Sequence, residues 1–460
     1  ADLEAIPYYQ PPEDSIELRY LKSCREKLGG AIPSRLNHFD ALTIPDLNTF
    51  SSVTQGSADR EISTTMAFVR LLSILVKDPN LGERIVPIVP DEARTFGMEG
   101  MFRQLGIYSS VGQLYEPVDT GQIMSYREDQ HGQVMEEGIN EGGAFAAWLA
   151  AATSYSNHAQ TLVPFYIFYS MFGFQRIGDL CWAAGDLSAR GFLLGGTSGR
   201  TTLNGEGLQH QDGHSHILAG TVPNCVSYDP TYAYELAVII QHGLQVMFVD
   251  KQPKYFYITV TNENYQQPAM PEGCEDGIKR GLYLLKAAPG KAKRSKKRVQ
   301  LLGSGAILRE VLAASEILQT EFEVFSDVFS VTSFNELKRD GDSVLRWNRL
   351  NPDQPARQSH VAVCLGDSGL PVVAATDYIK LYADQIRAQI PGAYHVLGTD
   401  GFGRSDTREK LRRHFEVDRY AIAYTALQAL AHDNIIALPV VLAARTRWGI
   451  DPASPEPVTL

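Results

Sequence analysis

The stretch Gly132-Gln-Val-Met-Glu-Glu-Gly-Ile-Asn-Glu-Gly-Gly-Ala144 predicts a turn that leads into an apolar helix. One carboxylate, that of Glu141, lies at the mouth of this helix. An acid in a first helical turn is often only a solvated charge that interacts well with the helix dipole. Here glycines flank Glu141 and several alanines follow, and small residues let another molecule or chain come close. We therefore single out Glu141 as a candidate functional carboxylate.

Three further motifs accompany this stretch. They are Thr153-Ser-Tyr-Ser156, the run Pro164-Phe-Tyr-Ile-Phe-Tyr-Ser-Met-Phe-Gly-Phe-Gln-Arg-Ile-Gly-Asp-Leu-Cys-Trp-Ala-Ala-Gly-Asp186, and Gly195-Gly-Thr-Ser-Gly-Arg-Thr-Thr-Leu-Asn-Gly-Glu-Gly-Leu-Gln-His210. With Glu136–Ala144, which looks like the pyrimidine-binding segment of a thiamine diphosphate enzyme, they resemble the homodimeric bacterial pyruvate dehydrogenase family. The resemblance covers nearly all of the chain, but only the middle and C-terminal portions of that family's longer polypeptide.

Alternating apolar strands and amphipathic helices predict an α/β fold. A helix is expected over 63–75 and a buried strand over 84–89; further strands are expected at 162–170, from 191, and over 254–261, 298–302 and 326–331. Together with the resemblance, this pattern predicts two doubly wound domains. They are a transketolase-like pyrimidine-binding domain at 59–270 and a transketolase C-terminal-like domain at 271–460, preceded by a proline-bearing connector at 1–58.

The connector begins abruptly inside what the resemblance presents as a continuing segment. This start suggests a truncated chain, a proteolytic fragment or the second half of a naturally split enzyme. The resemblance implies that an N-terminal diphosphate-binding domain is missing, together with its Gly-Asp-Gly motif and magnesium ligands.

The composition indicates which partners the protein binds and in which compartment it is found. The formal net charge of -11 argues against broad attraction to nucleic acid or anionic membranes, and the basic run 291–298 fits a solvated loop better than a nucleic-acid patch. Five widely spaced cysteines, without a C-x-x-C pair, suggest neither a disulfide framework nor a zinc site. With no secretory signal at Ala1–Ala5 and no membrane-spanning run, we expect a cytoplasmic location.

Several candidate residues follow the predicted strands, where open α/β sheets place their ligands. Asp91 and Glu92 come directly after the strand at 84–89, although a helix cap and a surface charge would explain them equally well. Tyr169 and Phe172 end the strand at 162–170, and such aromatics are often plain core. The resemblance implies cofactor contacts from Glu141, Phe172, Ile139 and Asp91.

His210, His214 and His216 lie in a glycine-rich loop with Glu206 and Asp212 nearby. This spacing could indicate a metal site, but the glycines indicate a loop rather than a helix that fixes ligand geometry. A loop that presents an imidazole to a charged substrate fits better, so no metal ligand is assigned. The resemblance implies that His210, Tyr169 and Glu92 act around the substrate.

The resemblance also implies the chemistry. Glu141 would hydrogen-bond the pyrimidine ring of thiamine diphosphate and favour the tautomer that activates the cofactor. Pyruvate would be decarboxylated and its acetyl unit passed to lipoamide on dihydrolipoyl acetyltransferase, in a homodimer or heterotetramer. The alternatives are a split carboligase subunit that forms acyloins from a 2-oxo acid, and a non-catalytic assembly relative.

Overall fold

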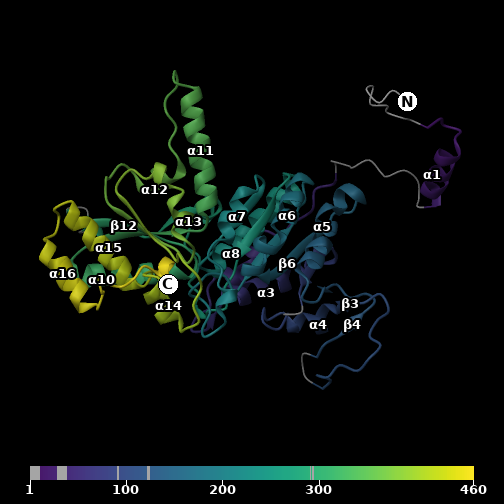
Figure 1. Ribbon diagram of the computed structural model, residues 1–460, viewed down its shortest axis with the longest axis horizontal. Coiled ribbons are helices and arrows are strands. Elements are labelled where there is room, and N and C mark those ends of the chain that lie inside the picture. Colours follow the sequence, from purple (N-terminus) through teal and green to yellow (C-terminus); the bar gives the residue numbers. More distant parts are fainter. Residues whose placement is uncertain (1–10, 28–38, 91–92, 122–124, 291, 293–294) are drawn as a thin grey trace.

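The computed structural model describes residues 11–27, 39–90, 93–121, 125–290, 292 and 295–460, and two parallel-stranded sheets form its framework (Figure 1). The first sheet has six strands in the order β5-β2-β6-β7-β9-β8, all parallel. Its strands are β2 (Ile85–Val89), β5 (Met135–Glu136), β6 (Val163–Tyr169), β7 (Phe192–Gly196), β8 (Cys225–Tyr228) and β9 (Tyr255–Thr259).

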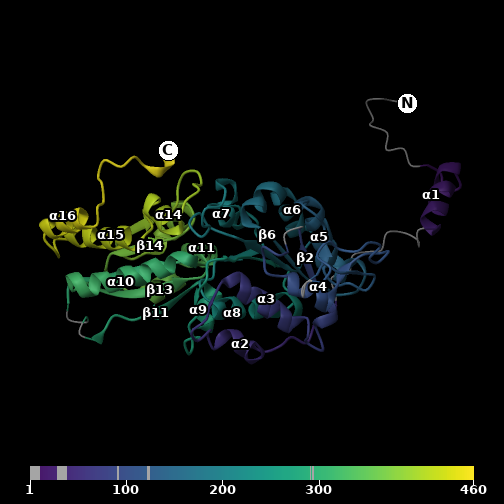
Figure 2. The same cartoon turned by 90° about the horizontal axis from the view of Figure 1, so that it is seen from below.

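Helices cover both faces of this sheet, as Figure 2 shows. The alternation along β6 explains why: Phe165 and Ile167 pack with the helices on one face, whereas Tyr166 and Phe168 pack with those on the other. One face carries α3 (Thr64–Leu75) and α8 (Ala233–Leu244), and the other carries α5 (Glu141–Asn157), α6 (Phe174–Asp186) and α7 (Ser215–Thr221).

Short elements surround the first sheet. They are α1 (Ile16–Lys27), none of whose residues is buried, α2 (Ser51–Thr54), β1 (Glu61–Ile62), α4 (Glu99–Leu105), β3 (Ile107–Tyr108), β4 (Glu128–Asp129) and β10 (Tyr265–Gln266). Strand β1 pairs with β10 and β3 pairs with β4. Within the described ranges, no helix is long and apolar enough to cross a membrane.

The second sheet has five strands in the order β11-β13-β12-β14-β15, of which only β11 is antiparallel to its neighbour. The strands are β11 (Leu282–Lys286), β12 (Arg298–Gly303), β13 (Phe325–Val331), β14 (Val372–Ala375) and β15 (Tyr394–Leu397). The helices are α9 (Glu275–Arg280), α10 (Leu308–Phe322), α11 (Phe334–Leu350), α12 (His360–Leu365), α13 (Lys380–Asp384), α14 (Arg408–His414), α15 (Arg419–His432) and α16 (Leu438–Arg447).

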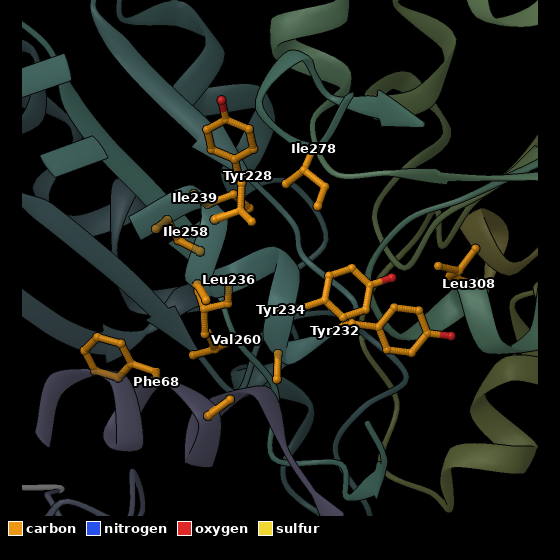
Figure 3. Packing of buried hydrophobic residues seen from close by; sticks show 14 of the residues in the cluster. Phe68, Tyr228, Tyr232, Tyr234, Leu236, Ile239, Ile258, Val260, Ile278 and Leu308 are labelled. Atoms are coloured by element: carbon orange, nitrogen blue, oxygen red, sulfur yellow. The ribbon is translucent and has the colours of Figure 1, made fainter. Parts of the chain in front are cut away.

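One hydrophobic cluster crosses from the first domain into the second. Figure 3 shows Phe68 of α3, Ile258 of β9 and Tyr234 of α8 in the same cluster as Ile278 of α9 and Leu308 of α10. All five are buried. The two domains therefore share core packing, beyond the polar contacts at their surfaces.

A buried carboxylate also joins the domains. Glu235, in the first turn of α8, accepts hydrogen bonds from the backbone N–H groups of Thr231 and Tyr232 at 2.6 and 2.9 Å. It also accepts from the hydroxyls of Tyr283 and Ser330 in the second sheet, at 2.7 and 2.6 Å. Burial raises the pKa of Glu235, and these four donors oppose that effect.

The predicted α/β class is confirmed, and the elements expected from periodicity form. The helix expected over 63–75 is α3, and the strand expected over 84–89 is β2. The chain packs tightly after β12, because a Cβ on Gly303 would lie 2.8 Å from the Cα of Leu308. The antiparallel edge strand β11 was not expected, and the proposed domain boundaries remain predictions.

Candidate functional site

The first helical turn of α5 holds Glu141 in place. The side chain of Asn140 caps the helix by accepting a hydrogen bond from the N–H of Gly143 at 3.0 Å. A Cβ on Gly143 would lie 2.5 Å from Asn140 Nδ2, so the cap requires glycine there. Glu141 is the first residue after the cap, and only 14% of its side chain is exposed.

Arg176 of α6 contacts this carboxylate. Its Nη1 atom donates to Glu141 Oε1 at 2.6 Å, and its guanidinium carbon lies 4.1 Å from the centre of the Phe172 ring. One arginine thus joins the candidate carboxylate to the candidate stacking ring. The face of Phe172 accepts a flat, electron-poor group, because a guanidinium already lies over it.

Three aromatic side chains meet at the carboxyl end of the first sheet. The ring of His210 lies 5.0 Å from that of Tyr169 and 5.2 Å from that of Phe172, and the Tyr169 and Phe172 rings are 5.9 Å apart. Phe96 contacts Tyr169 from the other side at 5.3 Å. Tyr169 ends β6, so the structure brings together residues that the sequence analysis expects at a strand end.

A close turn places Phe172 beside Tyr169. Ser170–Phe172 form one 3-10 turn directly after β6, and Gly173 follows. A Cβ on Gly173 would lie 2.2 Å from the ring of Phe168, so a larger residue would force the turn apart. This glycine allows the chain to double back into α6, which carries Arg176.

His210 lies in a second 3-10 turn, Leu208–His210. Its Nδ1 atom is buried, has no hydrogen-bond partner among the residues that the structure describes, and lies 3.6 Å from Glu206 Oε1. That distance is longer than a hydrogen bond. The imidazole is thus placed by its ring contacts with Tyr169 and Phe172, with the Glu206 carboxylate nearby.

The other two histidines of the loop serve the fold. His214 precedes α7, and its N–H bonds to Asp212 at 3.0 Å. His216 is fully buried, stacks on Tyr382 at 4.8 Å and shares a 2.9 Å hydrogen bond with Thr259. Burial lowers the pKa of His216 to about 3. Across the described residues, no group of three or more His, Cys, Asp or Glu side chains could hold a metal ion.

Two of the remaining candidates cannot be placed. Asp91 and Glu92 lie outside the described residues, so their expected roles stay predictions. Ile139 lies two residues before Glu141, and 71% of its side chain is exposed. The structure thus brings Glu141, Tyr169, Phe172 and His210 together at the carboxyl end of the first sheet.

Arg176 contacts the candidate site residues Glu141 and Phe172 but was not itself predicted from the sequence. It lies in the motif quoted for the resemblance, four residues after Phe172, and an arginine at this spacing from an aromatic could have suggested a cation–π pair. No sequence pattern predicts the contact between Arg176 and Glu141, because 35 residues separate the two.

The fold is that of the transketolase-like enzymes. Transketolase from Leishmania mexicana superposes with a TM-score of 0.61 at 15% identity, over 84% of this chain and 47% of that one. A structure titled split gene transketolase, inactive beta4 tetramer, superposes with a TM-score of 0.53 at 14% identity. That match covers 80% of this chain and 99% of that one.

Two family profiles match the chain. Residues 42–268 match the pyruvate dehydrogenase E1 component middle domain, and residues 281–418 match the transketolase-like C-terminal domain. The pyruvate dehydrogenase E1 component of Pseudomonas aeruginosa is 62% identical over all of this chain, and that of Escherichia coli K12 is 56% identical over 98% of it. The chain belongs to the family of pyruvate dehydrogenase E1 components, and it spans about half the length of these curated relatives, 52% and 50%.

Proposed function

We propose that this chain supplies the pyrimidine-side half of a thiamine diphosphate site for the oxidative decarboxylation of pyruvate, with transfer of the acetyl unit to lipoamide. The observation that carries the proposal is the group formed by Glu141, Phe172, Tyr169 and His210 at the carboxyl end of the first sheet. The names of the relatives favour this activity over acyloin formation or a purely structural role.

The residues present fit the aminopyrimidine half of the cofactor. Glu141 offers a shielded carboxylate, and Phe172 offers a ring face that already accepts a planar cation. When bound, thiamine diphosphate supplies a carbon nucleophile and an electron sink. Glu141 would hold a proton at a pyrimidine nitrogen, and Phe172 would orient the ring by stacking.

Tyr169 and His210 are proposed to contact the substrate. Their rings are 5.0 Å apart, and His210 Nδ1 lies 3.6 Å from Glu206 Oε1. We propose that the tyrosine hydroxyl and the imidazole of these two residues bind and relay protons to a carboxylate or hydroxyl of the substrate. Glu92 is proposed as a third group at the substrate, and Asp91 and Ile139 as further cofactor contacts.

The diphosphate and magnesium need a second domain. This chain spans about half the length of its curated relatives, 52% and 50%, and we propose that the magnesium ligands come from a diphosphate-binding domain of a longer polypeptide or of another subunit. The fold of this chain does occur as a separate polypeptide, since it matches 99% of the split-gene transketolase chain.

We further propose a homodimer or heterotetramer, dihydrolipoyl acetyltransferase as partner, and a cytoplasmic location.

Titration calorimetry tests the proposal. The chain is titrated with thiamine diphosphate and magnesium, first alone and then with a separately produced diphosphate-binding domain. Tight binding and pyruvate turnover should arise only in the mixture. Tight magnesium-dependent binding to the chain alone, or turnover by it, would disprove the half-site proposal.

A further inference from the structure

The loop that carries His210 belongs to the first domain, but the second domain holds it. Arg200, at the start of this loop, donates from Nη1 to the carbonyl oxygen of Thr399 at 2.5 Å and also to that of Gly401. The N–H of Gly205 bonds to the carbonyl of Asp406 at 2.9 Å. Backbone carbonyl groups of 399–406 therefore hold the start and the middle of the loop.

Gln211, the residue after His210, makes the most specific of these contacts. Its Oε1 atom accepts from the N–H of Arg404 at 2.7 Å, and its Nε2 atom donates to the carbonyl of the same residue at 2.5 Å. The side chain is 1% exposed. A two-way bond to a single residue fixes both the distance and the direction of the contact.

Gly403 allows the two segments to come this close. A Cβ on Gly403 would lie 2.6 Å from the carbonyl oxygen of Leu208 and 2.8 Å from Gln211 Oε1. Leu208 begins the 3-10 turn that ends at His210. Any side chain at position 403 would thus push on the turn from one end and on Gln211 from the other.

We propose that Gln211 is a positioning residue, through which residues 403 and 404 of the second domain set the place of the His210 imidazole. This inference rests on the proposed function for the role of His210, but not for the geometry of the loop. It gives the C-terminal domain a part in the reaction without any contact with substrate. A displacement of about 1 Å at a reacting group is enough to slow an enzyme markedly.

Hydrogen exchange tests the geometry without any activity. The variants are Gln211→Met, which keeps the size of the side chain and removes both hydrogen bonds, and Gly403→Ala, which acts from the second domain. The matched control is Gln267→Met. Gln267 is 2% exposed and likewise joins two backbone groups, accepting from Ala233 N–H at 2.9 Å and donating to the Ile62 carbonyl at 2.8 Å.

We expect faster exchange of the amides at 205–211 in Gln211→Met and Gly403→Ala, and no change there in Gln267→Met. Unchanged exchange in both test variants would overturn the proposal. If Gln211→Met does not fold, Gly403→Ala and the Gln211→Glu variant decide the question.

Kinetics with the diphosphate-binding domain present complete the test. Gln211→Met should lower kcat roughly tenfold with little change in KM for pyruvate. The kcat of Gln211→Glu, relative to that of the unaltered chain, should rise as pH falls. The reason is that a protonated carboxyl group can again donate a hydrogen bond to the Arg404 carbonyl. If His210→Ala impairs turnover and Gln211→Met does not, the positioning role is wrong. If His210→Ala has no effect, the proposed function of His210 fails, and the exchange data still decide how the loop is held.

Discussion

Arg176 and Glu141 form an ion pair that joins α6 to the first turn of α5, with 2.6 Å between Nη1 and Oε1. The same guanidinium lies over Phe172, 4.1 Å from the ring centre. A pyrimidine ring that used both the carboxylate and the aromatic face would have to displace this side chain. Half of the Arg176 side chain is exposed, so solvent can receive it.

Replacing Glu141 by Ala should abolish most of the activity and leave folding nearly intact. The side chain lies at a helix end and pairs with a half-exposed arginine, so its loss costs little stability. We expect pyruvate turnover in the complemented enzyme to fall more than tenfold, or about 1.4 kcal/mol of barrier. A smaller loss, with an unaltered circular dichroism spectrum, would show that the assigned role is wrong.

Replacing Arg176 by Met should tighten cofactor binding. The ion pair and the cation–π contact, which binding must disrupt, are together worth about 1 kcal/mol at a half-exposed site. Their removal should lower the Kd for thiamine diphosphate roughly fivefold in calorimetry with the complementing domain. Weaker binding would instead mean that Arg176 holds the cofactor.

Replacing His210 by Ala should reduce turnover, whereas His214→Ala should act mainly through the structure of the loop. The His210 ring contacts Tyr169 and Phe172, whereas the backbone N–H of His214 bonds within its own turn. Steady-state rates and thermal unfolding of both variants separate the two effects. A stoichiometric transition metal, lost on His214→Ala, would support a metal site in place of this assignment.

Glu235→Ala should weaken the joint between the domains. Two backbone N–H groups and two hydroxyls would lose their acceptor in a buried place, at a cost of about 3 kcal/mol or more in denaturant unfolding. Glu235→Gln is the control, because its amide can accept from the two N–H groups and donate to the two hydroxyls. If both variants are equally destabilised, the hydrogen bonds are not the cause.

His216 should make the fold sensitive to acid. Its pKa is about 3 in the folded chain and near 6.5 when unfolded, so between these values only the unfolded state takes up the proton. Stability is thus lost as pH falls from about 6.5 towards 3, by up to about 4 kcal/mol.

The His216→Gln variant isolates this effect. It removes the ionisable ring, and its stability relative to the unaltered chain should rise steadily as pH is lowered in urea titrations. Asp229 and Asp377, whose pKa values burial raises to about 7, bind protons in the folded state and act in the opposite direction. They are present in both proteins and cancel in the comparison. A pH-independent difference would contradict the assignment.

Periodicity alone predicts much of the fold, because β2, β6, β7 and β9 are long apolar runs buried on both faces. Strand β8 was missed, since Cys225–Tyr228 is a short run with mixed residues. Strand β11 pairs antiparallel at an edge, and no local pattern indicates which strand it will join.

Some contacts of the candidate site can likewise be predicted from the sequence, and others cannot. Tyr169 and Phe172 follow a predictable strand and are three residues apart, so their proximity can be expected from the chain. The contacts of Arg176 with Glu141, and of Gln211 with Arg404, join residues 35 and 193 positions apart. They depend on how helices and loops pack, which spacing in the sequence does not encode.

The hydrophobic cluster shared by the two sheets bears on chimaeras between relatives. Ile278 and Leu308 belong to the same buried cluster as Val260 and Tyr234, and Glu235 accepts hydrogen bonds from hydroxyls of the second sheet. A graft that exchanged one sheet and its helices for those of a distant relative would mismatch both sets of partners. The two domains are therefore not interchangeable modules, and each is constrained to change in step with the other.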